Sequence, residues 1–353
     1  MKLRSKEAGS ARVSDVRARV DAVLERFLAD RRSDLADADP RAAELVDEVR
    51  RVVVAGGKRL RPLFCYWGFA AAGGDDGEDI VAAAASLELL HTFAIIHDDV
   101  MDRSPRRRGQ PATHLALAPE GDAHAGISAA ILAGDLALVL SDELFADAGF
   151  TGEPFMSAFR WYHRMRSEVV AGQFLDIAAA RGVASEDEVR RIARLKSGGY
   201  TVEKPLLIGA ALAHASPDIE TTLSAYGTAL GEAFQLRDDV LGMFGDAAVT
   251  GKPAGDDIRA GKRTVLVARA YEQADPAQRA ILDDSVGDPE LDADGVDHVR
   301  DVVRATGALA AVEEHIEMLH HAALEALDRT PLGDDSARVA LVELAERSVQ
   351  RER

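Results

Sequence analysis

Hydrophobic positions recur at intervals of three and four residues along most of the chain, which is the period of a helix with one buried face. In the charged N-terminal segment this spacing connects Val13, Val16, Val20, Leu24 and Phe27. Longer Ala- and Leu-rich runs predict helices over about 80–102, 124–148, 154–182, 186–214 and 217–244, and the C-terminal part again follows a helical pattern. Turn residues separate these runs, and alternating strand patterns are absent. We therefore expect an all-α fold with one domain spanning residues 1–353.

The composition is typical of a large protein that is stable without disulfides. Of the 353 residues, 47% are hydrophobic, which is enough to bury a substantial core. The single cysteine, Cys65, cannot form an internal disulfide, and this favours a reducing compartment. Lys and Arg total 42 against 60 Asp and Glu, a formal net charge of −18. This charge argues against a protein that coats nucleic acid or binds anionic membranes constitutively. An anionic substrate would need cationic side chains concentrated at its site.

The most apolar stretch runs from Ile80 to His97 and has about the length of a membrane span. It contains Glu88 and His91, however, and leads directly into a pair of aspartates. Burying these groups in lipid is costly, so we expect a buried helix of a soluble protein. The charged N-terminal residues lack the apolar run of a signal peptide. We expect a cytoplasmic protein without stable membrane insertion.

Three carboxylates lie at the end of this apolar helix. On an ideal helix Asp102 lies about 40° from Asp98, and Asp99 about 100° away. Carboxylates placed this closely repel one another unless a cation neutralises them. Oxygen ligands with room for water suit Mg²⁺, which is commonly held by one or two carboxylates and substrate phosphates.

A second pair, Asp238 and Asp239, ends another apolar helix, and Gln235 projects between the two. Three glycines, at positions 227, 231 and 242, share a sector of this helix. Glycine disfavours a helix interior, so we expect another segment to pack against this bare face. A solvated acidic helix end would explain either pair alone, but two pairs flanked by basic loops favour a metal-assisted site.

Four basic segments could bind phosphate: Gly56–Pro62, Arg106–Gly109, Lys196–Gly198, and the two Gly-Lys pairs at 251–252 and 261–262. None has the spacing of a P-loop, and no dinucleotide fingerprint follows a strand. A basic loop alone is usually a solvated surface. Next to paired aspartates, however, such loops and Mg²⁺ together can clamp a diphosphate. We interpret residues 245–263 as an ordered functional loop, and the combined pattern predicts metal-assisted departure of a diphosphate inside an apolar bundle.

The motifs resemble those of trans-isoprenyl diphosphate synthases, the polyprenyl synthetase family, in family order along nearly the whole chain. They are GGKRLRP from Gly56, DDVMDRSPRRRGQP from Asp98, GQFLD from Gly172, KSG from Lys196, FQLRDDVLGMFGD from Phe234, and GKPAGDDIRAGKRT from Gly251. The resemblance implies long, mostly antiparallel helices around a central cavity, as in isoprenoid synthases. It also implies a homodimer that condenses isopentenyl diphosphate with an allylic diphosphate and binds three Mg²⁺ ions per site.

The resemblance also implies a role for each matching residue. The metal ligands would be Asp98, Asp99, Asp102, Asp238 and Asp239, and these would meet across the cavity. The allylic diphosphate would contact Arg107, Lys196, Lys252 and Lys262. Isopentenyl diphosphate would contact Lys58, Arg61, His91 and Arg108. The developing carbocation would be stabilised by oxygens of Gln173, Gln235, and the Lys196–Ser197 region.

Two positions depart from the family pattern. Gly242 stands where many members have the third aspartate of the second motif, so we assign no metal to it. Ser197 replaces the usual threonine but keeps its hydroxyl and carbonyl groups.

The resemblance points most closely to geranylgeranyl diphosphate synthases, with a C20 product. In this family, side chains shortly before the first motif form a floor for the growing tail; the candidates here are Leu90, Phe93 and Ala94. On an ideal helix Ala94 lies closer to the face of Asp98 than Phe93 does. Farnesyl or longer polyprenyl synthases are the nearest alternatives. A class I terpene cyclase would need only one diphosphate site, and a non-catalytic partner subunit should have eroded motifs, whereas both Asp-Asp pairs are intact.

Overall fold

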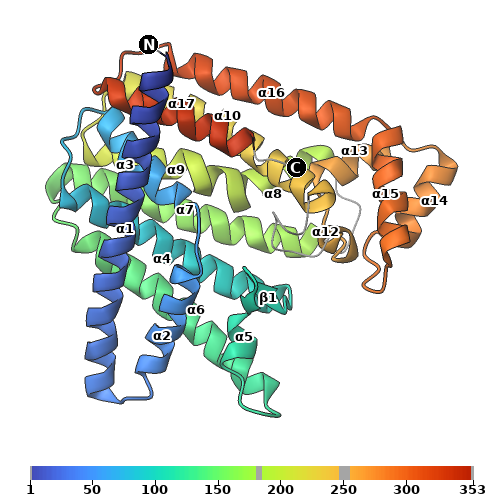
Figure 1. The fold of residues 1–353 in the computed structure, drawn as a ribbon, viewed down its shortest axis with the longest axis horizontal. Helices are drawn as coiled ribbons and strands as arrows, with labels where there is room; N and C mark the ends of the chain where they lie inside the picture. The colour runs from blue at the N-terminus through green and yellow to red at the C-terminus, as the bar shows by residue number, and fades with distance from the viewer. Residues whose placement is uncertain (1, 180–184, 246–254, 351–353) are drawn as a thin grey trace. The chain divides into compact units, whose positions relative to one another are not determined.

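The computed structural model describes residues 2–179, 185–245 and 255–350. Almost all of them are in helices or short turns, which confirms the all-α prediction (Figure 1). The sheet within the described residues is a two-residue antiparallel pair, β1 (Arg106–Arg107) with β2 (Gln110–Pro111).

The chain groups into two compact units. Unit 1 comprises Met1–Ala158, Ile208–Ala215 and Gly333–Ala340, and unit 2 comprises Phe159–Leu207, Ser216–Leu332 and Leu341–Arg353. The single domain expected from the sequence stays a prediction.

Unit 1 is built around the long apolar helix that carries the first aspartate motif. Its helices are α1 (Lys2–Ala38), α2 (Ala43–Val54), α3 (Leu60–Ala71), α4 (Glu78–Met101), α5 (Thr113–Ala116) and α6 (Ala123–Ala146). Acidic residues in the first turn of α4 favour the helix start, because they face the positive end of its dipole. Helix α4 packs against α6 most extensively and also against α1, α2 and α3. Its Leu87, Leu89 and Leu90 are fully buried, so the helix forms the core of the unit.

Unit 2 is built around the helix that carries the second motif. Its elements are α7 (Gly152–Ala179, beginning in unit 1), α8 (Glu186–Ala193), η1 (Arg194–Glu203), α9 (Lys204–Leu212, ending in unit 1), α10 (Pro217–Phe244), α12 (Asp256–Arg259), α13 (Val265–Gln273), α14 (Pro276–Ser285), α15 (Ala293–Ala305), α16 (Ala308–Leu327) and α17 (Asp335–Val349, beginning in unit 1). Ser216 caps the N-terminus of α10, and Pro217 fits its first turn. Helices α10 and α16 lie side by side (Figure 1).

The region expected as one helix over 186–214 is divided. A ten-residue π-helical segment, η1, separates α8 from α9. A π-helical stretch widens the turn and is frequent at functional sites. Its backbone can approach α10 closely because Gly198 has no side chain; a Cβ there would lie 2.6 Å from the carbonyl oxygen of Gly231.

The glycine face of α10 is indeed a packing face. A Cβ at Gly227 would lie 2.6 Å from the Cα of Glu203, and one at Gly231 would lie 2.5 Å from the carbonyl oxygen of Gly198. Neither position has room for a methyl group, since these neighbours are backbone atoms. The expectation that another segment packs against this face is confirmed: η1 packs at Gly227 and Gly231, and Asp257 lies beside Gly242.

Two helices, α4 and α6, are long and apolar enough to cross a membrane by length and composition alone. The most apolar stretch of α4 is 67% buried, as the sequence predicted for a core helix. The corresponding stretch of α6 is only 33% buried, so one side of α6 has few contacts within a single copy of the chain.

Candidate active site

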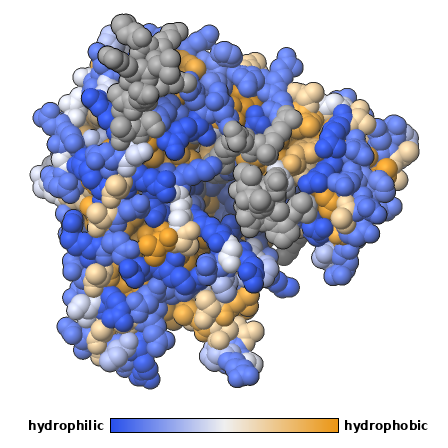
Figure 2. Space-filling view, viewed as in Figure 1, coloured by the Kyte–Doolittle hydropathy of each residue, from blue (hydrophilic) through white to orange (hydrophobic). Residues whose placement is uncertain are grey.

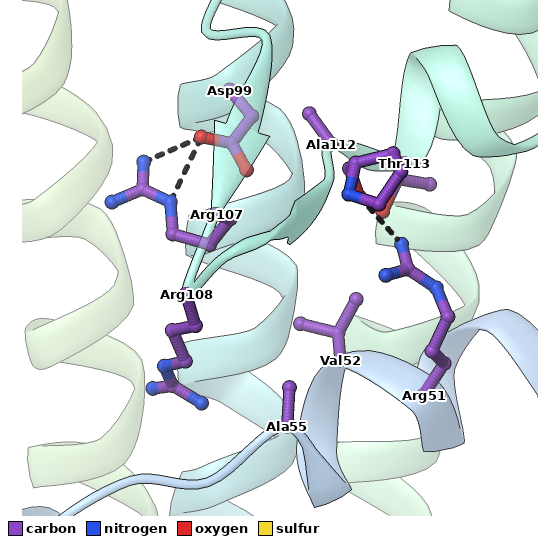
Figure 3. Close-up of a pocket in the computed structure, with 9 residues that line it drawn as sticks. Arg51, Val52, Ala55, Asp99, Arg107, Arg108, Ala112 and Thr113 are labelled. Atoms are coloured by element: carbon purple, nitrogen blue, oxygen red, sulfur yellow. Dashed lines mark hydrogen bonds and ion pairs between the residues drawn. The ribbon is translucent and has the colours of Figure 1, made fainter. Parts of the chain in front are cut away.

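The first aspartate motif lies at the C-terminal end of α4. Asp98 is partly buried, Asp99 is 2% exposed, and Asp102 follows the last helical residue and is exposed. The guanidinium of Arg107 donates to Asp99 Oδ1 at 2.9 Å from Nε and 2.5 Å from Nη2 (Figure 3). It also donates to Asp98 Oδ2 at 3.2 Å. Asp99 therefore has an arginine as counter-charge, and the charge of the more exposed Asp102 also acts on this arginine.

The β1–β2 hairpin returns the arginine motif to α4. Its tight turn contains Arg108 at φ 51° and Gly109 at φ 76°, and left-handed values of this kind suit a glycine. Pairing of Arg106 with Pro111 and of Arg107 with Gln110 fixes the register. The hairpin closes a small pocket between α2 and the end of α4 (Figure 3), which is lined by Arg51, Val52, Ala55, Asp99, Arg107, Arg108, Pro111, Ala112 and Thr113.

Arginines from two segments, the start of α3 and the β1–β2 hairpin, surround His91. Burial is the largest cause that lowers the pKa of His91 well below its usual value, and the charges of Arg61, Arg108, Arg107 and Arg59 lower it further. The ring is therefore neutral at pH 7 and can donate a hydrogen bond without adding charge. The structure brings together three residues predicted for the isopentenyl diphosphate site (Arg61, His91 and Arg108), and this cluster is strongly electropositive.

Arg59 has a structural role in this cluster that the sequence analysis did not predict. It has a left-handed backbone (φ 52°), and its side chain is 4% exposed. Its guanidinium donates to Asp21 at 2.7 Å, to Glu88 at 2.7 Å, and to the carbonyl oxygen of Val53 at 2.8 Å. Arg59 thereby ties α1, the end of α2 and α4 together, rather than pointing to solvent. A charged residue, Glu88, inside an otherwise apolar helix was the available signal.

The glycines before Arg59 keep this cluster close. A Cβ at Gly57 would lie 3.1 Å from Arg59 Nη1, 3.3 Å from Arg108 Nη2 and 3.4 Å from Glu88 Oε1. Arg108 also donates to the carbonyl oxygen of Gly56. The two glycines thus let the loop lie against the arginine hairpin, while Lys58 between them and α3 is exposed.

The second motif has a different electrostatic environment. Burial raises the pKa of Asp239 to about 8, and the neighbouring carboxylates of Asp257 and Asp238 add to this effect against opposing contributions from Gln235 and Lys262. Gln235 donates from Nε2 to Asp239 Oδ1 at 2.7 Å. Asp238 and Asp239 therefore form a site at which added positive charge is favourable.

Asp257 fills the space beside Gly242. A Cβ at position 242 would overlap the carboxylate of Asp257, which also pairs with Lys262 Nζ at 2.8 Å. Helix α12 thus places the carboxylate of Asp257 beside position 242, where the family pattern has an aspartate on the second-motif helix. Within the segment 245–263, which was expected as a loop, residues 246–254 lie outside the described residues and Asp257 lies in the short helix α12. The sequence analysis missed Asp257, since only the fold shows that α12 contacts α10.

The GQFLD and KSG motifs meet within unit 2. Lys196 Nζ lies 2.6 Å from Asp176 Oδ2. A Cβ at Gly172 would lie 2.5 Å from the backbone nitrogen of Lys196, so this glycine permits the close contact of α7 with η1. The same segments carry Gln173 and Ser197, so the structure groups three of the residues expected near the carbocation.

Two of the expectations concern the second substrate loop and the meeting of the two motifs. Lys252 lies outside the described residues. Asp98 belongs to unit 1 and Asp238 to unit 2, and their expected meeting across a cavity stays a prediction. Among the described residues, no group of three or more Asp, Glu, His or Cys side chains is arranged to hold an ion by itself. An ion at either motif would therefore need oxygens from substrate or water.

The candidate chain-length residues lie one to two turns before Asp98 on α4. Leu90 is fully buried, whereas Phe93 and Ala94 are partly exposed. The ring of Phe93 packs edge-on against His97, with 4.9 Å between ring centroids.

Comparison with known proteins identifies the family. Residues 43–305 match the family described as Polyprenyl synthetase. A geranylfarnesyl diphosphate synthase from Aeropyrum pernix is 35% identical over 85% of this chain and 92% of its own length. A geranylgeranyl diphosphate synthase from Saccharolobus solfataricus is 32% identical over 84% of this chain and 87% of its own.

A solved structure agrees with these sequence matches. A geranylgeranyl pyrophosphate synthase from Corynebacterium glutamicum, complexed with isoprenyl diphosphate and magnesium, has a TM-score of 0.90 at 39% identity, covering 94% of this chain and 98% of that one. These comparisons confirm the resemblance seen in the motifs. The chain belongs to the polyprenyl synthetase family and is a trans-prenyltransferase.

Proposed function

We propose that this enzyme condenses isopentenyl diphosphate with an allylic diphosphate in a Mg²⁺-dependent reaction and that its main product is the C20 geranylgeranyl diphosphate. The observation that carries this proposal is the arginine cluster around a neutral His91, directly beside the Asp98–Asp102 motif. A site for one diphosphate next to a site for a metal-bound diphosphate suits a two-substrate reaction.

We assign the cluster in unit 1 to isopentenyl diphosphate. Arg61, Arg108 and the neutral imidazole of His91 would donate to its phosphate oxygens, and exposed Lys58 would add positive charge. Arg59 would not bind substrate, because its donors already serve Asp21, Glu88 and a backbone carbonyl. Its role is to hold the loop that presents Lys58 and Arg61.

The residues of both motifs fit Mg²⁺. They supply carboxylate oxygens, the donors that this ion prefers, and at Asp239 the raised pKa shows that the site favours additional positive charge. Bound Mg²⁺ would stabilise the negative charge that develops on the departing diphosphate. We propose three ions per site, held by Asp98 and Asp102, with Asp99 in support, and by Asp238 with Asp239.

The reaction breaks an allylic carbon–oxygen bond, forms a carbon–carbon bond and then breaks a carbon–hydrogen bond. The allylic carbon–oxygen bond breaks, and the diphosphate keeps the electron pair, assisted by Arg107, Lys196, Lys252 and Lys262. The double bond of isopentenyl diphosphate then attacks the allylic cation, and a proton leaves to the departed diphosphate. Oxygens of Gln173, Gln235 and the Lys196–Ser197 region would stabilise the cation before the attack.

The most direct test is product chromatography. Purified protein would be incubated with Mg²⁺, isopentenyl diphosphate and a C5, C10 or C15 allylic primer. We expect elongation to C20 and loss of activity when the metal is chelated. No elongation with any primer would overturn the proposal, and a cyclic hydrocarbon formed without isopentenyl diphosphate would favour the terpene cyclase alternative.

We assign the floor of the product site to Phe93, with Leu90 and Ala94 beside it on α4. Support comes from the family pattern and from the partial exposure of Phe93. Phe93→Ala should lengthen the products, because the tail could extend past the missing ring. A product distribution identical to that of the wild type would remove Phe93 from this role.

We also propose that the enzyme is a homodimer and that α6 forms its interface. The side chains of Ile127, Ile131, Leu132 and Val139 are 37–59% exposed in a single copy. Figure 2 shows a mostly hydrophilic face on which hydrophobic residues gather low in the view, where α5 and α6 lie in Figure 1. Exposed apolar area of this kind marks an interaction surface, and the strong apolar character of α6 favours a second copy as its partner.

Replacing Leu132 and Val139 together with glutamate tests this interface. We expect monomers by analytical ultracentrifugation, because the charges would be buried against an apolar surface. The control is Met318→Glu on α16, where a single exposed side chain is replaced. A dimer that survives the double change would place the interface elsewhere.

We further propose a cytoplasmic location. The supporting observations are the substantial burial of α4 and the two polar substrates. Cell fractionation should find the protein in the soluble fraction. Recovery with membranes, or flotation of the purified protein with lipid vesicles, would instead make the exposed side of α6 a lipid-binding face.

A further inference from the structure

His97 lies directly before Asp98, yet its side chain turns away from the aspartates and toward α6. Its Nε2 donates to the carbonyl oxygen of Ile131 at 3.1 Å. The same ring packs edge-on against Phe93, one turn earlier on α4, at a centroid distance of 4.9 Å and an interplanar angle of 71°. One imidazole therefore connects the proposed floor residue to the neighbouring helix.

The backbone of α6 is shaped for this ring. A Cβ at Gly134 would overlap the imidazole of His97, so only glycine leaves space for the ring here. Around this contact, Ile96 of α4 packs with Ala130 and Ala133 of α6 in a fully buried cluster. The small residues bring the two helices together, and this closeness holds the ring of His97 between Phe93 and α6.

We propose that His97 is a positioning residue for product length: it braces the ring of Phe93 against α6 and so fixes the depth of the floor. This inference rests on the proposed role of Phe93. A phenylalanine ring has a few staggered χ1 positions, and packing decides which one is occupied. With the imidazole hydrogen-bonded to Ile131 and seated over Gly134, Phe93 cannot rotate toward α6.

Replacing His97 should change the lengths of the products more than the turnover rate. In His97→Ala the ring of Phe93 can move into the space that the imidazole filled. The ring then takes more than one position, and the product site can accept tails of more than one length. We expect the ratio of longer products to C20 to rise about two- to tenfold, the range given by the loss of one aromatic edge contact. The KM for isopentenyl diphosphate should stay within about twofold, since His97 does not face the arginine cluster.

Two further variants separate the ring from the hydrogen bond. His97→Phe keeps a ring against Phe93 and Gly134 but cannot donate to Ile131, so its products should stay close to those of the wild type. His97→Gln keeps a donor but lacks the ring, so its products should lengthen as in His97→Ala. The matched control is Asp135→Asn, which changes a 58% exposed carboxylate 3.7 Å from His97 Nε2 and should leave the products unchanged.

The experiment compares product lengths by chromatography for these variants and for Phe93→Ala, with circular dichroism to confirm folding. If Phe93→Ala lengthens the products but His97→Ala and His97→Gln do not, the brace is wrong while the floor stands. If Phe93→Ala itself has no effect, the floor proposal fails. Should His97→Ala fold poorly, His97→Gln alone decides: a wild-type product distribution overturns the inference.

Discussion

The two Asp-Asp pairs occupy equivalent places in sequence but different electrostatic environments. Each pair lies near the C-terminal end of a long helix, Asp98 and Asp99 in the last turn of α4 and Asp238 and Asp239 more than one turn before the end of α10. The negative end of the helix dipole therefore acts mainly on the first pair. At the end of α4, Arg107 lies within hydrogen-bond distance of both Asp98 and Asp99. In α10 the residue directly before Asp238 is an arginine, Arg237, but its guanidinium pairs with Glu313 of α16.

The two regions stabilise buried negative charge in different ways. In unit 1 the protein supplies the counter-charge itself, because the guanidinium of Arg107 donates to the buried carboxylate of Asp99. In unit 2, Asp239 has an amide donor and further carboxylates nearby, and its pKa rises to about 8 because burial is not offset by an arginine. We therefore expect the second motif to gain more from an added cation than the first.

Removing a single carboxylate from either motif should have the largest effect. We expect Asp98→Ala and Asp238→Ala each to lower turnover at least about 100-fold while circular dichroism stays unchanged, since lost ligand groups affect metal binding directly. The control is Asp218→Ala, an exposed carboxylate at the opposite end of α10. Near-wild-type turnover in either variant would remove that motif from the metal site.

Arg107→Met should reveal the internal counter-charge in unit 1. It leaves Asp99 buried without its guanidinium, and the free energy of unfolding should fall by about 3 kcal/mol. Denaturant unfolding measures this, and adding Asp99→Asn to Arg107→Met should restore part of the loss. Arg237→Met provides the comparison. The side chain of Glu313 is more exposed than that of Asp99, so the loss in free energy of unfolding should be smaller. Equal losses would contradict the contrast between the two regions.

Gly242→Asp tests whether the second motif has room for another carboxylate. The new side chain would displace Asp257 and disturb its 2.8 Å pair with Lys262. We expect turnover to fall about tenfold, with a higher Mg²⁺ requirement. Combining Gly242→Asp with Asp257→Ala should relieve the overlap and recover activity. A single variant with undiminished activity would show that the loop adapts freely.

Asp239→Asn should change the pH dependence of stability. An unfolded Asp loses its proton near pH 3.8, whereas folded Asp239 keeps it until about pH 8. The wild type therefore binds more protons when folded across this window, and its stability falls as pH rises. Without metal, the Tm of Asp239→Asn should exceed that of the wild type by a few degrees near pH 8. The difference should shrink as the pH falls and vanish near pH 4. Asp218→Asn is the control, and a pH-independent difference would contradict this account.

The helices and their chemistry could be predicted from the chain because both are local. The period of the apolar residues located α4, α6, α7 and α10, and the predicted bounds of α10 agree with the structure. The bare face of α10 indicated that a segment packs there, since three glycines within one helix need a spatial reason. The arginine and aspartate motifs identified diphosphate chemistry because their spacing within each segment sets which side chains can converge.

Only the tertiary structure decided which segment meets which. Arg59 and Lys58 are neighbours in sequence, but Arg59 turns inward to Glu88 while Lys58 is exposed. Asp257 fills the space beside Gly242, and His97 lies over Gly134. These pairs are separated by 15 to 37 positions along the chain, counted from their residue numbers. Their contacts depend on how helices and loops pack, and no local periodicity encodes that distance in space.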